Sequence, residues 1–241
     1  MSDNWDDEII PEPAMAVPGR NSGTLTAMID DYITKHPDNQ PRKYIGASSI
    51  GSPCERKLWY GYTGVVGANN EPLLQRTFDI GKSLEGLVLD YLVDAGCSLV
   101  RSHNLLFLQH SSIPEFQGHA DAIWSITENP LREAIIEVKT ARNSSFNVFV
   151  RDGLLKWHPV YYNQVQAYMG MSGIHEAYVI AINKDTSALH DECVRFDLMA
   201  YEMLCHKAER IIAATEPPPR INQNSTFFMC RGCQYKSICH G

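Results

Sequence analysis

The sequence lacks the marks of a membrane or secreted protein. It contains no run of 18 or more apolar residues, so no membrane-spanning helix is expected. The chain begins Met-Ser-Asp-Asn-Trp-Asp-Asp-Glu, which is acidic and has none of the basic-then-apolar order of a secretory signal. We therefore expect a cytoplasmic protein that does not enter a membrane.

An excess of basic charge is also missing. The formal net charge is −7 at pH 7, whereas proteins that coat nucleic acids are usually basic. This argues against a simple coating protein, but an enzyme can combine a local basic groove with acidic metal-binding residues. No Gly-x-x-x-x-Gly-Lys-[Ser/Thr] motif occurs, so we expect a stand-alone protein without a helicase motor.

What the sequence does contain indicates one folded domain after a polar tail. Residues 1–23 combine acidic residues with three prolines, which is typical of a disordered tail. The remaining residues, 24–241, are long enough for one α/β domain with a real core. The cysteines near the C-terminus form a cluster within about 217–241.

Hydrophobic periodicity predicts the elements of that domain. We expect helices over 25–35, from Cys54 through Tyr60, and over 73–95, 161–171 and 198–215. We expect strands over 97–108, 118–126, 133–139, 177–183 and 192–196. The order predicts a mixed α/β fold in which a small sheet is flanked by helices.

Two carboxylates and a lysine form the most informative pattern. Asp121 ends the sequence Gly-His-Ala-Asp, and Glu137 and Lys139 stand two apart in a predicted strand. Side chains two apart in a strand point to the same face. Carboxylates bind Mg²⁺ or Mn²⁺, and a nearby lysine stabilises charge on a phosphate, so the set suits phosphodiester hydrolysis. The alternative is a strand whose charges are merely solvated.

Two helical segments add to this pattern. Glu85 follows Gly-Lys-Ser-Leu in the helix over 73–95 and could complete a metal site; otherwise it is an ordinary exposed glutamate. Gln164 and Tyr168 are four apart and share a helix face. They could bond a DNA backbone or brace Lys139; otherwise they form the polar side of an amphipathic helix.

The seven cysteines are unevenly distributed. In a reducing cytosol they are not expected to form disulfides. Cys230 and Cys233 form a C-x2-C pair and Cys239 follows, which leaves a four-ligand zinc or iron–sulfur centre one ligand short. Cys54 is the candidate for the fourth ligand, and His240 is an alternative ligand if the metal is zinc. Three further cysteines are expected to be small core residues: Cys97, Cys193 and Cys205.

The ordered set Gly-x-x-x-Glu, Gly-x-x-Asp, Glu-x-Lys and Gln-x-x-x-Tyr resembles the PD-(D/E)XK nuclease superfamily, especially its RecB-like exonucleases. The resemblance implies a restriction-endonuclease-like core. It implies Mg²⁺ or Mn²⁺ ligands at Glu85, Asp121, Glu137 and the main-chain carbonyl of Val138. It also implies a catalytic lysine and a helical motif: Lys139, with Gln164 and Tyr168. Many RecB-like members carry histidine where this chain has Glu85, which makes that ligand a departure from the pattern.

The early cysteine and the late C-x2-C-x5-C resemble the iron–sulfur branch of the same nucleases, which includes the AddB nuclease domain and the CRISPR-associated Cas-four-type exonucleases. The resemblance covers residues 44–241. It implies a [4Fe–4S] cluster on Cys54, Cys230, Cys233 and Cys239 that joins the N- and C-terminal parts. Basic and aromatic residues suited to phosphate contact and base stacking are Arg56, Lys57, Lys82, Arg142 and Trp157.

The sequence therefore predicts a metal-dependent DNA exonuclease that prefers single-stranded ends. We expect it to act in recombination or repair, phage DNA metabolism or CRISPR adaptation, in a bacterial, archaeal or phage-infected cell. It would act alone, as a homo-oligomer or with a recombination or adaptation protein. Two alternatives stay open: a non-catalytic or partner-activated DNA-binding module with a nuclease-like fold, and a zinc-stabilised interaction protein.

Overall fold

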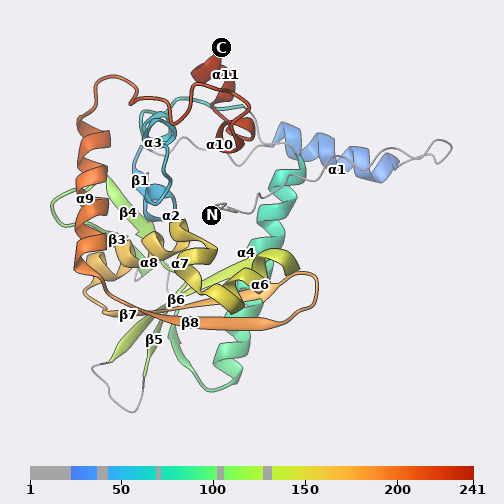
Figure 1. Ribbon diagram of the computed structural model, residues 1–241. Coiled ribbons are helices and arrows are strands. Elements are labelled where there is room, and N and C mark those ends of the chain that lie inside the picture. The colour runs from blue at the N-terminus through green and yellow to red at the C-terminus, as the bar shows by residue number, and fades with distance from the viewer. Residues whose placement is uncertain (1–22, 37–42, 69–71, 102–105, 127–131) are drawn as a thin grey trace.

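The computed structural model describes residues 23–36, 43–68, 72–101, 106–126 and 132–241, and its fold is mixed α/β, as predicted (Figure 1). The helices are α1 (Thr24–Lys35), α2 (Ala47–Ile50), α3 (Glu55–Tyr62), α4 (Pro72–Asp94), α6 (Asn143–Asp152), α7 (Leu154–Trp157), α8 (Pro159–Ser172), α9 (Leu198–Ala213), α10 (Phe228–Arg231) and α11 (Lys236–His240). The strands are β1 (Ile45–Gly46), β2 (Ser98–Val100), β3 (Phe107–Gln109), β4 (Phe116–His119), β5 (Ala122–Ser125), β6 (Glu133–Ala141), β7 (Glu176–Asn183) and β8 (Leu189–Arg195). The expected tail over residues 1–22 lies outside the described residues.

The strands form two sheets. One has three strands in the order β1-β4-β3, and the other has five in the order β2-β5-β6-β7-β8. In the larger sheet β6 and β7 run parallel, while β2–β5, β5–β6 and β7–β8 are antiparallel. The parallel pair requires a crossover, and α6, α7 and α8 supply it along the chain. This crossover brings α8 onto the sheet.

Alternate residues of β6 face two different hydrophobic layers. Ile136 and Val138 pack with Val88 and Leu89 of α4. Ile135 belongs to the larger core, which includes buried residues of α6 and α8. Because side chains alternate along a strand, Glu137 and Lys139 fall on the same side as Ile135 and face α8.

Two segments were wrongly expected to form one strand each, because each is divided between the two sheets. Residues 118–126 are divided between β4 of the small sheet and β5 of the large sheet, with Ala120 and Asp121 between them. The segment over 97–108 likewise supplies β2 to the large sheet and β3 to the small one. Apolar patterning predicts extended chain but not its hydrogen-bonding partner, so it did not reveal the change of sheet.

Several short elements were also missed. Strand β1 pairs in parallel with β4, and α6 and α7 fill a stretch for which no element was predicted. Helix α6 buries Phe146 and Phe149, and Gly153, with φ 80°, follows its last residue. The long predicted helices are confirmed within a few residues by α1, α4, α8 and α9, and Gly96, with φ 95°, follows the end of α4 as expected.

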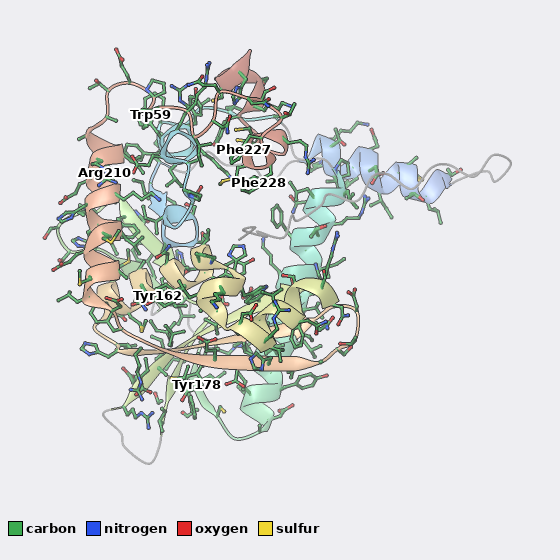
Figure 2. The ribbon with its side chains drawn as sticks, viewed as in Figure 1. Trp59, Tyr162, Tyr178, Arg210, Phe227 and Phe228 are labelled. Carbon is green, nitrogen blue, oxygen red and sulfur yellow. The ribbon has the colours of Figure 1, made fainter. Side chains whose placement is uncertain are left out.

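The C-terminal helices pack beside the early helix α3 (Figure 1). The rings of Tyr60 and Tyr235 are 5.2 Å apart. Trp59 and Arg210, both labelled in Figure 2, join α3 to the α9 region: Trp59 Nε1 donates to the Ala214 carbonyl at 2.9 Å, and Arg210 pairs with Glu55 at 2.7 Å. Across the part of the chain that the structure describes, each helix is too short or too polar to cross a membrane.

Candidate functional site

Asp121, Glu137 and Lys139 come together where β5 and β6 pair. Asp121 directly precedes β5, and the register that sets Ala122 opposite Ile136 sets Asp121 opposite Glu137. The Val138 amide donates to Asp121 Oδ2 at 2.7 Å. Lys139 Nζ donates to Glu137 Oε1 at 2.5 Å. The two carboxylates and the ammonium predicted from the sequence are therefore neighbours.

Burial dominates the electrostatics of this group. Glu137 is 2% exposed, and its burial, reinforced by the nearby Asp121 carboxylate, raises its pKa to about 8. Burial also raises the pKa of Asp121, with Lys139 acting in the opposite direction. Burial lowers the pKa of Lys139, but Glu137, Tyr161 and Asp121 outweigh it and hold that pKa above its usual value. The lysine therefore stays an ammonium at neutral pH.

Glu85 of α4 adds a third carboxylate. It lines a cavity of about 250 Å³ together with Asp121, His119 and Arg101. Burial, followed by repulsion from Asp121, raises the pKa of Glu85 to about 7. The structure thus places Glu85 beside Asp121, and His119 on the same cavity.

The donor set fits a hard divalent cation. Glu137 Oε2 is buried and has no hydrogen-bond partner among the described residues, although a buried carboxylate oxygen normally has one. The pKa values of the three carboxyl groups are all raised, so a bound cation would stabilise their charged forms. Mg²⁺ and Mn²⁺ prefer such oxygen ligands. Within the described residues, however, no three His, Cys, Asp or Glu side chains are gathered tightly enough to hold a metal ion as they stand.

Gln164 and Tyr168 connect α8 to Glu137 and to the main chain of His119. Gln164 Nε2 donates to Glu137 Oε1 at 2.6 Å and to Tyr168 Oη at 2.9 Å. Tyr168 donates to the carbonyl oxygen of His119 at 2.6 Å. The two side chains are 3% and 2% exposed, and these hydrogen bonds are made within the protein. They brace Glu137 rather than Lys139.

Gly118 makes this arrangement possible. A Cβ at this position would lie 2.8 Å from Tyr168 Cε1 and 2.9 Å from the Ala47 Cβ. Both distances are shorter than carbon atoms tolerate. The glycine of the Gly-x-x-Asp pattern therefore provides space for the tyrosine of the Gln-x-x-x-Tyr pattern.

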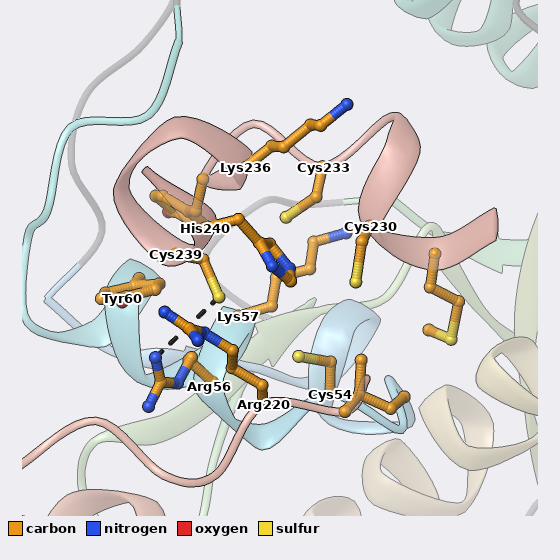
Figure 3. Close-up of a pocket in the computed structure, with 13 residues that line it drawn as sticks. Cys54, Arg56, Lys57, Tyr60, Arg220, Cys230, Cys233, Lys236, Cys239 and His240 are labelled. Atoms are coloured by element: carbon orange, nitrogen blue, oxygen red, sulfur yellow. Dashed lines mark hydrogen bonds between the residues drawn. The ribbon is translucent and has the colours of Figure 1, made fainter. Parts of the chain in front are cut away.

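Four cysteines surround a second cavity, of about 170 Å³ (Figure 3). Cys54 lies at the start of α3, and Cys230, Cys233 and Cys239 come from the C-terminal segment. Burial, reinforced by the three other thiols, raises the pKa of Cys230. His240 lines the same cavity, and its buried Nε2 has no hydrogen-bond partner within the described ranges. Thiols and an unpartnered imidazole are ligands suited to a soft or borderline metal.

The residues expected to contact DNA lie in different surroundings. Trp157, which was expected to stack on a base, is 8% exposed and stacks on Phe149 with ring centres 4.4 Å apart. Arg56 donates to the carbonyl oxygens of Pro217 and Pro218 at 3.4 and 2.5 Å and thereby holds the C-terminal segment. Lys57 lines the cysteine cavity.

Two more basic residues and three more cysteines were singled out in the sequence. Lys82 stands one turn before Glu85 on α4, and Arg142 is the N-cap of α6. Cys97 and Cys205 are partly buried, but Cys193 is exposed, so it is not the small core residue that was expected.

Sequence reasoning missed Tyr161. Lys139 Nζ lies over its ring, 4.6 Å from the ring centre. The available signal was the spacing, because Tyr161 is three residues before Gln164 and therefore shares its helix face.

Comparisons with known proteins identify the fold. The sequence matches no family model and no curated protein sequence. The structure is similar to that of LHK-Exo, an alkaline exonuclease from Laribacter hongkongensis. Solved in complex with dAMP, that protein gives a TM-score of 0.55 at 15% identity, over 72% of this chain and 88% of the other. A second LHK-Exo structure gives a TM-score of 0.53 at 14% identity over the same shares of the two chains.

A further similarity covers more of the chain. The protein SSO0001 gives a TM-score of 0.52 at 16% identity, over 90% of this chain and 96% of the other. At such identities the similarity establishes a common architecture. The chain therefore has the mixed α/β fold of the alkaline exonuclease LHK-Exo.

Proposed function

We propose that the chain is a Mg²⁺- or Mn²⁺-dependent DNA exonuclease of the PD-(D/E)XK type. The observation that carries the proposal is the buried group of Asp121, Glu137 and Lys139, in which Glu137 Oε2 accepts no hydrogen bond from the part of the chain that the structure describes. The fold agrees with it, because LHK-Exo is an alkaline exonuclease solved in complex with dAMP. The resemblance to RecB-like exonucleases supports a preference for single-stranded ends.

Each residue has a role in this proposal. The metal ligands would be Glu85, Asp121, Glu137 and the main-chain carbonyl of Val138. A bound ion polarises the phosphate and lowers the pKa of water. Lys139 remains charged and donates a hydrogen bond to a phosphoryl oxygen, which stabilises the negative charge that develops there. Gln164 fixes the orientation of Glu137 through its 2.6 Å hydrogen bond.

The cysteine cavity extends the proposal to a second metal centre. We propose that Cys54, Cys230, Cys233 and Cys239 hold a [4Fe–4S] cluster, which ties α3 to the C-terminal segment. The support is that these four thiols line one cavity. Zinc is the rival, with His240 as a substitute ligand. Iron–thiolate clusters absorb visible light near roughly 400 nm, whereas zinc, with its filled d shell, is colourless.

The nuclease proposal is tested by degradation of end-labelled DNA. Anaerobically purified protein would be incubated in Mn²⁺ or in EDTA with single-stranded DNA, with blunt double-stranded DNA, or with both substrates in competition. Asp121→Asn and Lys139→Met alter the site with little change of side-chain volume. Asp191→Asn, an exposed carboxylate of β8, is the matched control.

The expected result is Mn²⁺-dependent release of nucleotides by the wild type and by Asp191→Asn, faster from single-stranded ends. Both site variants should lose at least about a hundredfold in rate, which is the usual scale for a group that stabilises transition-state charge. A folded wild type that degrades neither substrate would overturn the proposal and favour a DNA-binding or partner-activated module. Equal rates on the two substrates would overturn only the strand preference.

A further inference from the structure

One face of α8 carries three side chains that meet the active face of β6. Tyr161, Gln164 and Tyr168 are separated by three and four residues, so they lie on one side of the helix. Gln164 bonds Glu137, and Tyr168 bonds the His119 carbonyl. Tyr161 presents its ring to Lys139 Nζ, 4.6 Å from the ring centre. Each residue of this face thus contacts a different part of the proposed site.

The ring of Tyr161 is itself firmly held. His158 stacks on it with ring centres 3.6 Å apart and an angle of 14° between the planes. Trp157 meets it edge-on at 5.5 Å and in turn stacks on Phe149, which is fully buried. A continuous row of rings therefore runs from the hydrophobic core to the lysine. This row gives the buried Trp157 a supporting role.

The charges around the ring favour a cation at this place. The face of an aromatic ring attracts an ammonium group, and more strongly where water is largely excluded. The Lys139 side chain is 16% exposed. Burial, followed by the charge of Lys139, lowers the pKa of His158 to about 4, so the stacked imidazole is neutral and does not repel the lysine.

Glu137 cannot be the only anchor of Lys139. Its Oε1 already accepts hydrogen bonds from both Gln164 and Lys139, and the same carboxylate is a proposed metal ligand. A lysine that acts on a phosphate therefore needs a second contact, with a group other than this carboxylate. The ring of Tyr161 supplies one.

We propose that Tyr161 is a positioning residue that holds the Lys139 ammonium at the reacting phosphate through the face of its ring. The proposal rests on the proposed nuclease function. It extends the helical pattern of this chain from Gln-x-x-x-Tyr to Tyr-x-x-Gln-x-x-x-Tyr. The contact with Lys139 depends on the aromatic ring of Tyr161 and not on its phenolic hydroxyl.

Two substitutions separate ring from hydroxyl. Tyr161→Phe keeps the ring face, and Tyr161→Leu removes it. Tyr162→Leu is the matched control, since Tyr162 is the next residue of α8 (labelled in Figure 2) and is also partly buried against the main core. We expect Tyr161→Leu to lower kcat roughly thirtyfold, the factor that a desolvated cation–π contact is worth. Tyr161→Phe and Tyr162→Leu should stay within about threefold of the wild type, and KM for DNA should not change.

A second readout does not depend on DNA cleavage. Reductive methylation of lysines, followed by peptide mass mapping, should modify Lys139 faster in Tyr161→Leu than in the wild type, Tyr161→Phe or Tyr162→Leu. An inactive wild type would overturn the nuclease proposal, and the methylation rates would still test the contact. The positioning proposal is overturned if Tyr161→Phe loses as much kcat as Tyr161→Leu, or if Tyr161→Leu changes neither kcat nor the reactivity of Lys139.

Discussion

Gln164 donates a hydrogen bond of 2.6 Å to Oε1 of Glu137 from a helix 27 residues further along the chain. The donor and the acceptor are both buried. A buried carboxylate that loses such a partner keeps the cost of desolvation and loses its orientation. The glutamine therefore helps to determine both the stability of the site and its geometry.

Replacing Gln164 by leucine should weaken metal binding. The substitution removes one of the two hydrogen bonds that Glu137 Oε1 accepts from Lys139 and Gln164, so the carboxylate loses a constraint on its direction. Loss of such a supporting hydrogen bond typically lowers metal affinity by about 10–100-fold. Calorimetric titration with Mn²⁺ measures the change.

Gln166→Leu is the control for that experiment. Gln166 is also a buried glutamine of α8, but it bonds the Arg195 carbonyl and the Asp197 amide. Both variants should unfold at lower urea concentration, and only Gln164→Leu should bind Mn²⁺ more weakly. Equal Mn²⁺ affinity in the two variants would contradict a specific role for Gln164.

Adding one methyl group at Gly118 should destabilise the fold. The new Cβ would lie 2.8 Å from Tyr168 Cε1, so Tyr168 or β4 must shift. Overpacking of this kind costs about 1–3 kcal/mol, which urea denaturation resolves. Gly86→Ala is the control: its Cβ would meet nothing within 4 Å, and alanine in a helix interior is favoured over glycine by about 0.5–1 kcal/mol. The prediction fails if Gly118→Ala is as stable as the wild type.

The sequence predicted which side chains of the candidate site lie together better than it predicted the fold around them. Glu137 and Lys139 share a face because strand periodicity is local, and Gln164 and Tyr168 share one because helix periodicity is local. The change of sheet at Ala120 and Asp121 depends on which strands pair across the molecule, and no local pattern encodes that.

Trp157 illustrates the same limit. As an aromatic residue it was expected to stack on a base. The unpredicted helices α6 and α7 turn it inward onto Phe149 instead. Tyr161 was overlooked although its spacing from Gln164 was visible, because spacing alone does not show that a ring faces a lysine.

Without divalent metal, stability should fall as the pH rises from about 6.5 to 8. The folded protein holds protons on Glu85 and Glu137, whose pKa values are raised from 4.5 to about 7 and about 8. The unfolded chain has released those protons already, so the folded state binds more protons, and raising the pH favours unfolding. Below about pH 6.5 the lowered pKa of His158 acts in the opposite direction.

Urea midpoints in EDTA over this pH range test the effect. The pH dependence should be weaker in Glu137→Gln and in Glu85→Gln, because an amide does not titrate. Mn²⁺ should restore stability and bind more tightly as the pH rises, since it competes with protons for the carboxylates. A midpoint that rises with pH in metal-free wild type would contradict the assigned direction of these pKa shifts.

Cys230→Ala should give poorly soluble, colourless protein. This thiol is buried in the cavity that all four cysteines line, and losing one ligand of four prevents assembly of the proposed cluster. Cys193→Ala, an exposed cysteine of β8, should remain soluble and brown. Visible absorbance and iron content per chain are the measurements. A soluble, brown and fully active Cys230→Ala protein would refute the cluster proposal.

The shared helix face of Tyr161, Gln164 and Tyr168 limits how α8 can change during evolution. Each residue inserted into or deleted from a helix rotates everything beyond it by about 100°. One insertion between Tyr161 and Gln164 would therefore turn the tyrosine away from Lys139 while Glu137 kept its glutamine. Point substitutions at the other positions of this segment can accumulate, but the number of residues in it cannot change. Insertions and deletions among distant homologues should accordingly fall outside residues 161–168.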